Sequence, residues 1–460
     1  MRALTVEEIE KATKGRLLCG DRKHLISGIS TDSRTIGERD LFFPIIGENF
    51  DGHDFIPSAI KNGVSAIVAS KEDKIRDILE TNIDIILVDD TLEALQQLAK
   101  YYISTLNIKK IAVTGSVGKT STRDMLYYIC KEKYYTGTTV GNFNNDIGVP
   151  LTVFSLEEGM EAAVIEMGMD HFDEIHRLVD IVRPNIGIIT NVGISHMENL
   201  GSMEGILKAK MEITDFFTEE NTLVINEDCV MLNREKISGD YKVLSVGSEE
   251  KNDYIVSKIC DFGEKGIKFN LNYNGEDREI RLNIPGAHNG INAALAIAAC
   301  QNIGVSIDEA VRGLEKIKLT DKRLTILENH GIKVINDTYN ACPESMRSAL
   351  NTLINTSGKR KIAILGDMFE LGKESDFYHA EVGQYAASMN IDLIIAVGPI
   401  SESIAKGGRK YMDEKHVLYF PEKEKLIEQL HTILKEGDVV LVKGSRGMTM
   451  EKIVEKIINE

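Results

Sequence analysis

The hydrophobic positions of the chain fall into two alternating patterns: short apolar runs, and longer segments in which apolar residues recur with a helical period. In the middle of the chain the short runs are "KIAVTG" (110–115), "AAVIEMG" (162–168), "IGIITNVG" (186–193) and "TLVINED" (222–228). Short, wholly apolar strands separated by helices are typical of a parallel sheet covered on both faces. The pattern therefore predicts a doubly wound α/β domain here.

The period changes after this region. The stretch "GIKFNLNYNGEDREIRLNI" (266–284) alternates between apolar and polar residues around Asn274 and Gly275, which predicts a β-hairpin. The next stretch, "GAHNGINAALAIAACQNIG" (286–304), predicts a helix. Beyond about residue 320, a second alternating series predicts a Rossmann-like α/β domain. Its strands are "KVIND", "KIAILGD", "DLIIAVG", "HVLYF" and "DVVLVKGS".

The first part of the chain has shorter elements. The runs "DLFFPI" (40–45) and "SAIVAS" (65–70) predict strands, and "DIILVDD" (84–90) leads into a helical pattern. We therefore expect an α/β protein with three domains: a small α/β domain, a central domain with a mostly parallel sheet, and the Rossmann-like domain. In chain order their expected ranges are 1–88, 89–319 and 320–460.

Composition narrows the possible partners. The net charge of −17 argues against a nucleic-acid or anionic-membrane binder, although a local basic loop could still bind an anionic small molecule. The six cysteines are scattered without a C-x-x-C pair, so neither a zinc site nor a disulfide framework is indicated. The N-terminal "MRALTVEEIEKATKG" predicts an amphipathic helix instead of a signal peptide, and no apolar run reaches the ~18–20 residues of a membrane span. We expect a cytoplasmic protein without membrane insertion.

The stretch "IAVTGSVGKTSTRDML" (111–126) nearly matches the phosphate-loop pattern G-x-x-x-x-G-K-[ST], with Val113 at the position of the first glycine. A strand would turn here through glycines into a helix, whose N-terminus and exposed N–H groups attract phosphate. Lys119 can reach the β- and γ-phosphates, and the Thr120 hydroxyl suits Mg²⁺. A glycine-rich turn without a ligand is the less favoured alternative. The loop predicts nucleotide binding and leaves the reaction open.

Two further residues stand where ligands gather in an open α/β sheet, beyond the carboxyl ends of the strands. Glu166 ends one predicted strand, and His196 follows the next one. Together they could complete a magnesium site that faces the phosphates. Each signal is weak alone, because a single histidine in a loop is more often a surface hydrogen-bonding residue.

Lys210 lies on the apolar side of a predicted helix in "SMEGILKAKMEITDFF" (202–217). At roughly 100° per residue it falls within one narrow apolar stripe, whereas Lys208 points the opposite way. Two interpretations stay open. In one, the stem is buried and the amine reaches water. In the other, the amine itself is buried, and desolvation lowers its pKa and leaves a neutral nucleophile. Such an amine can add CO₂ to become a carbamate that binds magnesium.

Several motifs resemble, in chain order, those of the Mur ligase family. In the central domain they are "TGSVGKTSTRDM", "NFNNDIGVPLT", "EMGMDHFDEI", "TNVGISHMENLGS", "AKMEI" and "GAHNGINAALA". The missing first glycine is usual in this family. "STDSRTIGERDLFFPIIGENFDGHDFI" is similar to its uridine-nucleotide-binding N-terminal domain, and "INDTYNACPESMRSAL", "ILGDMFELG" and "VKGSRGMTME" to its C-terminal domain. The family usually has Asn where Cys342 stands and Asn, Ser or Thr where Val117 stands, but neither change removes a phosphate or metal ligand.

The resemblance implies an ATP-dependent ligase that forms an amide bond through an acyl phosphate. Within the family, "NFNNDIGVP" and "DTYNACP" are similar to the member that adds D-alanyl-D-alanine to UDP-N-acetylmuramoyl-tripeptide in peptidoglycan precursor synthesis. The Y-A-H-T-P-D-like segment and the D-x-P-R signature of the member that adds the preceding amino acid are missing. The implied cofactors are ATP, two Mg²⁺ ions and a carbamate on Lys210. A monomer is expected.

The resemblance also implies roles for individual residues. The catalytic residues would be Lys119, Glu166, His196 and Lys210, the last three binding magnesium together with Thr120. Nucleotide-binding residues would be Thr114, Gly115, Ser116, Val117, Gly118, Lys119, Thr120 and Ser121 in the loop, Asn289 and Asn292 near adenine, Arg323 near the γ-phosphate and Asp337 near the ribose. Substrate-binding residues would be Ser33, Gly47, Asp51 and His53 at the uridine end, Asn144 and Asn145 near the bridging sugar or phosphate, and Asn340 and Ser345.

Two alternatives remain at this stage. A ligase of the same fold could use another amine donor, as in the diamino-acid-adding and folylpolyglutamate-type enzymes. A nucleotide-switched binding protein without ligase activity is the alternative from a different class.

Overall fold

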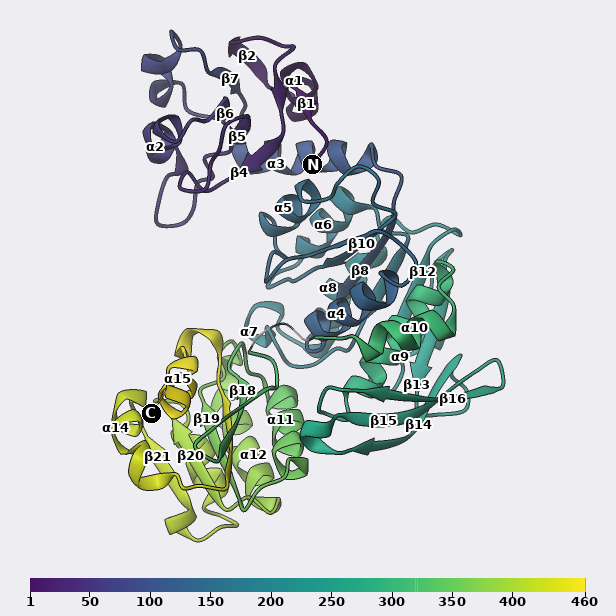
Figure 1. Ribbon diagram of the computed structural model, residues 1–460, viewed down its shortest axis with the longest axis vertical. Helices are drawn as coiled ribbons and strands as arrows, with labels where there is room; N and C mark the ends of the chain where they lie inside the picture. The colour runs from purple at the N-terminus through teal and green to yellow at the C-terminus, as the bar shows by residue number, and fades with distance from the viewer. Residues whose placement is uncertain (319, 321, 460) are drawn as a thin grey trace.

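The computed structural model describes residues 1–318, 320 and 322–459. It contains three α/β domains, with the N-terminal domain at the top of Figure 1, the central domain in the middle and the C-terminal domain at the lower left. Residue 319, at which the second predicted boundary falls, lies outside the described residues. The predicted boundaries themselves stay predictions.

The N-terminal domain has a five-stranded sheet in the order β2-β7-β6-β5-β4, parallel except for β2. In that order the strands are Arg16–Cys19, Asp84–Leu87, Ala66–Ala69, Asp40–Phe42 and Gly28–Ser30. A two-stranded pair, β1 (Leu4–Thr5) and β3 (Leu25–Ile26), lies beside it. Its helices are α1 (Val6–Thr13), which confirms the predicted amphipathic helix, and α2 (Ile56–Lys61).

Helix α3 (Thr91–Ser104) joins the N-terminal and central domains. Its buried Tyr102 hydroxyl donates to the Leu156 carbonyl at 2.7 Å and accepts from the Arg2 N–H at 2.9 Å. One side chain therefore ties the start of the chain to the central domain.

The central domain is built on a nine-stranded sheet in the order β16-β15-β14-β13-β12-β11-β8-β10-β9. From β8 to β16 the strands are Lys109–Thr114, Thr136–Thr138, Ala162–Glu166, Ile186–Ile189, Thr222–Asn226, Lys242–Gly247, Tyr254–Asp261, Ile267–Tyr273 and Glu276–Leu282. The strands from β9 to β14 are parallel, and the last two are antiparallel. Strand β8 lies between β10 and β11 in the sheet. The chain runs from β8 to β9 and β10 on one side and then crosses to β11 on the other, so a ligand crevice is expected at the carboxyl end of β8.

Helices cover both faces of this sheet. In chain order they are α4 (Lys119–Cys130), α5 (Gly148–Phe154), α6 (Glu174–Val182), α7 (Met197–Leu200), α8 (Met203–Met211), α9 (Asn289–Asn302) and α10 (Ile307–Glu315). Along β8, Ile111 and Val113 face the apolar cluster of α4 and α9, whereas Ala112 faces the cluster of α5, α6 and α8. This alternation explains why a strand buried on both faces reads as a continuous apolar run.

The predicted hairpin is confirmed. Asn274 and Gly275 have φ of 51° and 81° and form a two-residue turn between β15 and β16. Both residues with positive φ fit a turn whose twist matches that of the strands.

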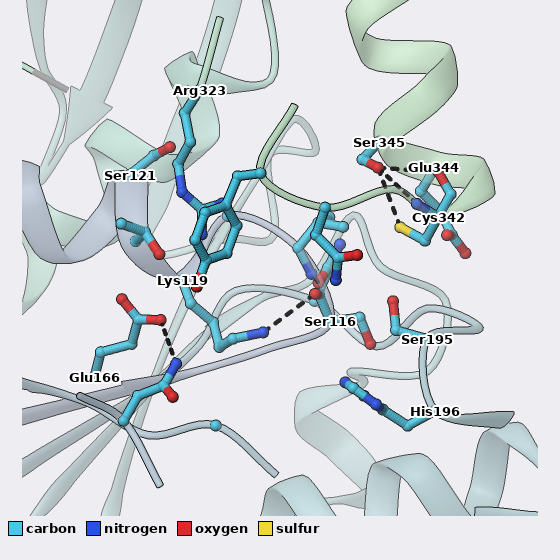
Figure 2. Close-up of a pocket in the computed structure, with 18 of the residues that line it drawn as sticks. Ser116, Lys119, Ser121, Glu166, Ser195, His196, Arg323, Cys342, Glu344 and Ser345 are labelled. Carbon is cyan, nitrogen blue, oxygen red and sulfur yellow. Dashed lines mark hydrogen bonds between the residues drawn. The ribbon is translucent and has the colours of Figure 1, made fainter. Parts of the chain in front are cut away.

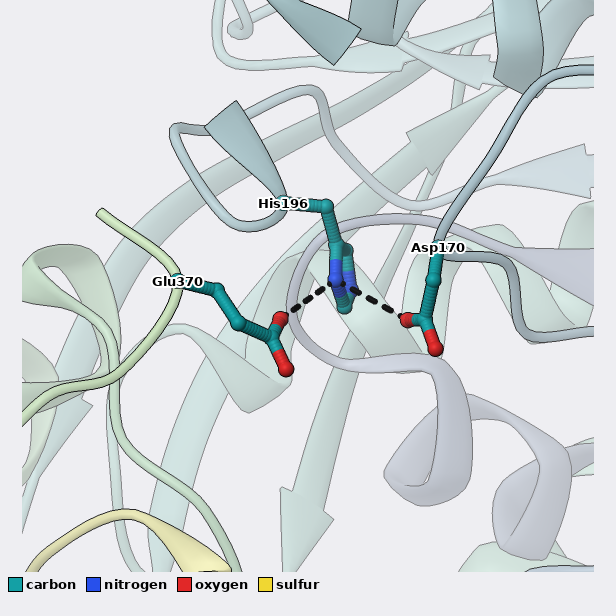
Figure 3. A group of neighbouring side chains, drawn as sticks. All are labelled: Asp170, His196 and Glu370. Carbon is teal, nitrogen blue, oxygen red and sulfur yellow. Dashed lines mark ion pairs between the residues drawn. The ribbon is translucent and has the colours of Figure 1, made fainter. Parts of the chain in front are cut away.

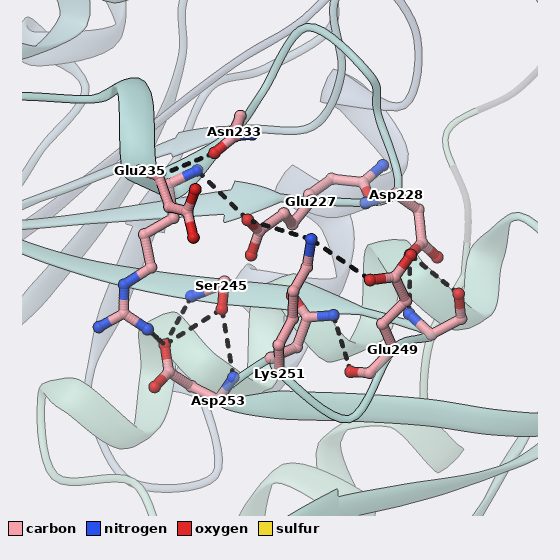
Figure 4. A network of polar contacts seen from close by, with 12 residues as sticks. Glu227, Asp228, Asn233, Glu235, Ser245, Glu249, Lys251 and Asp253 are labelled. Atoms are coloured by element: carbon pink, nitrogen blue, oxygen red, sulfur yellow. Dashed lines mark hydrogen bonds and ion pairs between the residues drawn. The ribbon is translucent and has the colours of Figure 1, made fainter.

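A cluster of charged and polar residues lies at the ends of β12 and β13 (Figure 4). Asp253 accepts from the Ser245 N–H at 2.8 Å and pairs with Arg234 at 3.0 Å. Asp228 accepts from the Ser248 N–H at 2.8 Å. These contacts connect the loops that follow β12 and β13, so the cluster has a structural role.

The C-terminal domain has a six-stranded sheet in the order β17-β18-β22-β19-β20-β21. In that order the strands are Thr325–Asn329, Ile332–Asp337, Asp438–Lys443, Arg360–Gly366, Leu393–Val397 and Val417–Phe420. Five are parallel and were predicted; β17, an antiparallel edge strand, was missed. The helices are α11 (Pro343–Asn355), α12 (Ser375–Ser388), α13 (Glu402–Gly408), α14 (Lys423–Ile433) and α15 (Glu451–Asn459). Within the described part of the chain, no helix has the length and apolarity needed to cross a membrane.

Candidate active site

The phosphate loop joins β8 to α4 and lines a cavity of about 680 Å³, whose walls come from the central and C-terminal domains. Gly118 has φ of 84°, and a Cβ there would lie 2.9 Å from Asn292 Oδ1. A Cβ at Gly115 would meet Thr190 Oγ1 at 1.9 Å. Both positions therefore require glycine. Val113 is a buried residue of β8, so the strand continues where the usual loop would begin.

The segment after β11 holds this loop in place. Asn191 Oδ1 accepts from the Val117 N–H at 2.9 Å, and the Asn191 carbonyl accepts from the Ser116 N–H at 3.1 Å. The Ser116 hydroxyl donates to the Gly193 carbonyl at 3.1 Å and accepts from the Gly193 N–H at 2.9 Å. The loop is thus preorganised by the chain that leads to His196.

Lys119 is turned back onto its own loop. Its Nζ donates to the Gly115 carbonyl at 2.6 Å and to the Ser116 carbonyl at 3.2 Å, and Figure 2 draws the contact with Ser116. Burial lowers the pKa of Lys119, and the negative charge of Glu166 partly offsets this. An anionic phosphate at the loop would favour the protonated form.

Glu166 lies at the end of β10 with its two oxygens in different surroundings. Oε1 accepts from Asn144 Nδ2 at 2.8 Å. Oε2 is buried and has no hydrogen-bond partner among the described residues, although Arg123 Nη1 lies at the ion-pair distance of 3.5 Å. A buried, underpaired carboxylate oxygen suits a cation.

His196 meets two acidic residues that were not predicted (Figure 3). Its Nδ1 lies 2.7 Å from Glu370 Oε2 and 3.0 Å from Asp170 Oδ1. The ligand atoms of these three residues lie within 4.8 Å of one another. The proximity of His196 lowers the pKa of Glu370. The surface interpretation of His196 is therefore wrong, because the residue lines the cavity between two domains.

Lys210 is buried in α8, with 1% of its surface exposed. The interpretation in which its amine reaches water is therefore wrong. Burial, followed by the positive charge of Lys119, holds the pKa of Lys210 well below its ordinary value. Lys210 does not itself line the cavity, whereas Lys208 is exposed as expected.

The C-terminal domain supplies the other wall. The Arg323 guanidinium lies 4.2 Å from the centre of the Tyr339 ring, and its Nε has no hydrogen-bond partner in the described part of the chain. Asp337 Oδ2 accepts from Lys443 Nζ at 2.5 Å. The ring of Tyr339 thus orients Arg323, whereas Asp337 is already paired with Lys443 of the same domain.

The cavity brings together most of the predicted residues of these two domains. Those that line it are Ser116, Val117, Gly118, Lys119, Thr120, Ser121, Asn144, Asn145, Glu166, His196, Asn292, Arg323, Asp337, Asn340 and Ser345. Four predicted residues of these domains do not line it: Thr114, Gly115, Lys210 and Asn289. Asn289 Oδ1 accepts from Asn292 Nδ2 at 3.1 Å, so it supports a lining residue.

The residues predicted at the uridine end lie in the N-terminal domain, outside this cavity. Asp51 binds Lys71 Nζ at 2.5 Å and His53 Nδ1 at 2.7 Å, and the ring of His53 is buried. A Cβ at Gly47 would lie 2.5 Å from the Phe50 ring, so the ring packs against this glycine. The Ser33 carbonyl accepts a hydrogen bond from Asn62 Nδ2 at 2.8 Å. Their assignment to substrate stays a prediction.

Sequence reasoning missed residues whose roles depend on tertiary contacts. Asp170 follows Glu166 in "EMGMD", and Glu370 belongs to "GDMFELG", so both motifs were noticed without these residues being chosen. Arg123 Nη2, buried in α4, donates at 2.7 Å to Thr320 Oγ1, in the segment between α10 and β17. No local pattern distinguishes Arg123 from other helical arginines.

The fold and the cavity define a three-domain α/β protein of the P-loop type, with a cavity between its central and C-terminal domains. Family models match in three parts: a Mur ligase family catalytic domain over 25–103, a Mur ligase middle domain over 113–300 and a Mur ligase glutamate ligase domain over 322–446. The chain belongs to the Mur ligase family and is an ATP-dependent ligase.

Similar proteins cover the whole chain. The UDP-N-acetylmuramoyl-tripeptide–D-alanyl-D-alanine ligase of Bacillus subtilis (strain 168) is 38% identical over 99% of this chain and 98% of its own. A crystal structure of MurF from Acinetobacter baumannii has a TM-score of 0.91 at 30% identity and covers 100% of both chains. A MurF ligase from Thermotoga maritima in complex with ADP has a TM-score of 0.82 at 29% identity, covering 93% of this chain and 96% of its own.

Proposed function

We propose that this protein joins D-alanyl-D-alanine to UDP-N-acetylmuramoyl-tripeptide in an ATP-dependent step of peptidoglycan precursor synthesis. One observation carries the proposal: the phosphate loop and Glu166 face Arg323 and Asp337 across a single cavity shared by two domains. The relative from Bacillus subtilis carries this reaction in its name and is similar over nearly the full length of both chains, which supports the choice of substrates.

The proposed reaction has two steps. A carboxylate is a poor electrophile, so the terminal carboxylate of the tripeptide first attacks the γ-phosphorus of ATP, and the bond to the bridging oxygen breaks to give an acyl phosphate and ADP. The neutral amine of D-alanyl-D-alanine then attacks the acyl carbon. The carbon–oxygen bond to phosphate breaks, and the amine proton passes to solvent or phosphate. Lys119 and Arg323 offset the charge on the transferring oxygens.

Thr120, Glu166, His196 and a carbamate on Lys210 would hold the magnesium ions. The unpartnered, buried Oε2 of Glu166 supports this fit, as does the Thr120 hydroxyl at the start of α4. When bound, magnesium neutralises charge on the phosphoryl oxygens. The carboxylates beside His196 hold that ring at the cavity wall.

The surroundings of Lys210 support the carbamate. A buried amine with a depressed pKa is neutral and nucleophilic, so its nitrogen can attack CO₂ and lose a proton. This reaction would replace an unfavourably buried amine by an anion beside cationic Lys119. It would also supply oxygen atoms, which magnesium prefers to nitrogen.

Contacts between the domains would keep water from the acyl phosphate. Ile194 of the central domain packs against the apolar cluster of the C-terminal domain, and its N–H donates to Glu344 Oε1 at 3.1 Å. ATP bound at both the phosphate loop and Arg323 would favour the arrangement of the domains in which both sites contact it.

An amine-donor panel tests the proposal. The protein is incubated with ATP, Mg²⁺ and UDP-N-acetylmuramoyl-tripeptide plus D-alanyl-D-alanine, L-lysine or meso-diaminopimelate, and products are read by mass spectrometry. We expect a ligated product with D-alanyl-D-alanine and phosphate release that requires both co-substrates. Ligation of a free diamino acid instead would assign another amine donor, and nucleotide hydrolysis without ligation would contradict the function. A monomeric state and a cytoplasmic location stay predictions.

A further inference from the structure

Glu344 is a second buried carboxylate in the cavity wall, and no step above uses it. It lies in the first turn of α11, on the C-terminal domain, next to Cys342 and Ser345 (Figure 2). Its Oε1 accepts from the Ile194 N–H at 3.1 Å. Its Oε2 is buried and has no hydrogen-bond partner among the residues that the structure describes.

The position of this carboxyl group is fixed by the central domain. A Cβ at Gly193 would lie 2.8 Å from Glu344 Oε1 and 3.4 Å from Oε2, so the carboxyl rests against the glycine backbone. Gly193 is in turn hydrogen bonded to Ser116 of the phosphate loop. The free oxygen is therefore held at a defined place relative to the nucleotide site.

Three other carboxylates around the cavity already have charged partners. Asp337 pairs with Lys443, and Asp170 and Glu370 pair with His196. Among the described lining residues, the carboxylates with a buried, unpartnered oxygen are therefore Glu166 on the central domain and Glu344 on the C-terminal domain. Figure 2 draws these two carboxylates on opposite sides of Lys119.

We propose that Glu344 binds the ammonium group of the incoming amine substrate, an inference that rests on the proposed function. A buried carboxylate is costly unless a cation or donor pairs with it, and the phosphates and carboxylate of the other substrates would be repelled. The α-amino group of a peptide has a pKa of about 8, so near neutral pH it arrives mostly as an ammonium with three N–H donors. Binding at Glu344 places this group on the C-terminal wall, facing the side where Glu166 lies. The bound ammonium releases one proton to solvent before the neutral amine attacks the acyl phosphate.

The substitution Glu344→Gln separates substrate binding from a structural role. Glutamine keeps an oxygen that can accept from Ile194 N–H, but it removes the charge. We expect the KM for D-alanyl-D-alanine to rise about tenfold to a hundredfold, because a hydrogen bond to a charged group is lost. The KM values for ATP and the UDP substrate, and the Mg²⁺ concentration for half-maximal activity, should change by less than about twofold.

A substrate analogue without the amine provides the readout that a structural role would not produce. Propionyl-D-alanine has nearly the shape of the dipeptide but no ammonium, so its inhibition constant should be the same for the wild type and Glu344→Gln. Glu344→Asp, which keeps the charge, should have a lower KM for the dipeptide than Glu344→Ala. This second pair is used if Glu344→Gln does not fold. The matched control is Glu381→Gln on α12, whose carboxylate pairs with Arg347 at 2.6 Å and does not line the cavity.

Three results would overturn the inference. One is an unchanged dipeptide KM in Glu344→Gln. Another is a parallel rise for ATP and propionyl-D-alanine, which would make Glu344 a structural contact between the domains. The last is a shifted Mg²⁺ requirement, which would make it a metal ligand. If the wild type ligates no amine at all, the proposed function fails and the inference falls with it, so the two failures are distinguishable.

Discussion

Two lysines of this enzyme are almost equally buried and have opposite surroundings. Lys443, at the end of β22, is 2% exposed, and its Nζ lies 2.5 Å from Asp337 Oδ2 and 2.9 Å from the Asn340 carbonyl. Lys210, in α8, is 1% exposed and has no carboxylate within ion-pair distance in the described part of the chain. A carboxylate partner favours the charged form of a buried lysine, whereas without such a partner desolvation lowers the pKa, as it does for Lys210.

The largest effect is expected from Lys210→Ala. If the carbamate is a magnesium ligand, kcat should fall by about 10³-fold, the size of effect seen when a charge-stabilising group is lost from an active site. The circular dichroism spectrum should be unchanged. Added acetate or formate, which supply a carboxylate in the space left by the side chain, should restore part of the activity. Full activity of the variant would contradict a role for Lys210.

The next effect concerns Lys443→Met. Removing one partner of a buried ion pair leaves Asp337 uncompensated, so the C-terminal domain should lose about 3 kcal/mol of stability. Because the protein has several domains, the transition of this domain is followed separately in urea. The double variant Lys443→Met, Asp337→Asn should recover part of the loss. If Lys443→Met were as stable as the wild type, the Lys443–Asp337 ion pair would not stabilise the C-terminal domain.

A smaller, pH-dependent effect is expected at the interface between the central and C-terminal domains. Glu264 binds Lys333 Nζ at 2.7 Å, and although burial opposes its charged form, hydrogen bonds from Lys333 and Ser357 lower the pKa of Glu264 to about 2. Because the folded pKa is depressed below its ordinary value of 4.5, the pair stabilises this contact between the two domains above that pH and loses this effect as pH falls toward 2. Glu264→Gln should therefore weaken closure at pH 7 by about 1 kcal/mol.

Small-angle X-ray scattering with an ATP analogue measures this closure. The wild type and Glu264→Gln should differ at pH 7 and converge as the pH is lowered below the ordinary pKa of a glutamate. The same difference at every pH would show that the carboxylate charge is not responsible.

The smallest effect is expected from Lys208→Ala. Lys208 is exposed, and its Nζ lies 5.6 Å from the centre of the Phe172 ring, a contact that contributes about 0.5 kcal/mol at a surface. Activity should stay within about twofold of the wild type, as measured by phosphate release. A loss comparable to that of Lys210→Ala would mean that the helix as a whole, and not the buried amine, is sensitive to substitution.

The positions of many strands and helices along the chain, and the helical stripe around Lys210, could be predicted because apolar periodicity is a local signal. The phosphate loop was also predictable, since its glycines and Lys119 are contiguous. Strand β17 was missed, because "TILEN" is half-exposed at a sheet edge and does not form an apolar run. The acidic neighbours of His196 and the free oxygen of Glu344 could not be predicted, since they depend on how two domains meet.

The most direct test of the account concerns the chemical state of Lys210. Carbon-13 NMR of the enzyme in ¹³C-labelled bicarbonate should show a carbamate resonance, and the spectrum of Lys210→Ala should lack it while that of Lys208→Ala keeps it. No carbamate resonance in the wild type, or an identical one in Lys210→Ala, would contradict the claim that this buried amine captures CO₂.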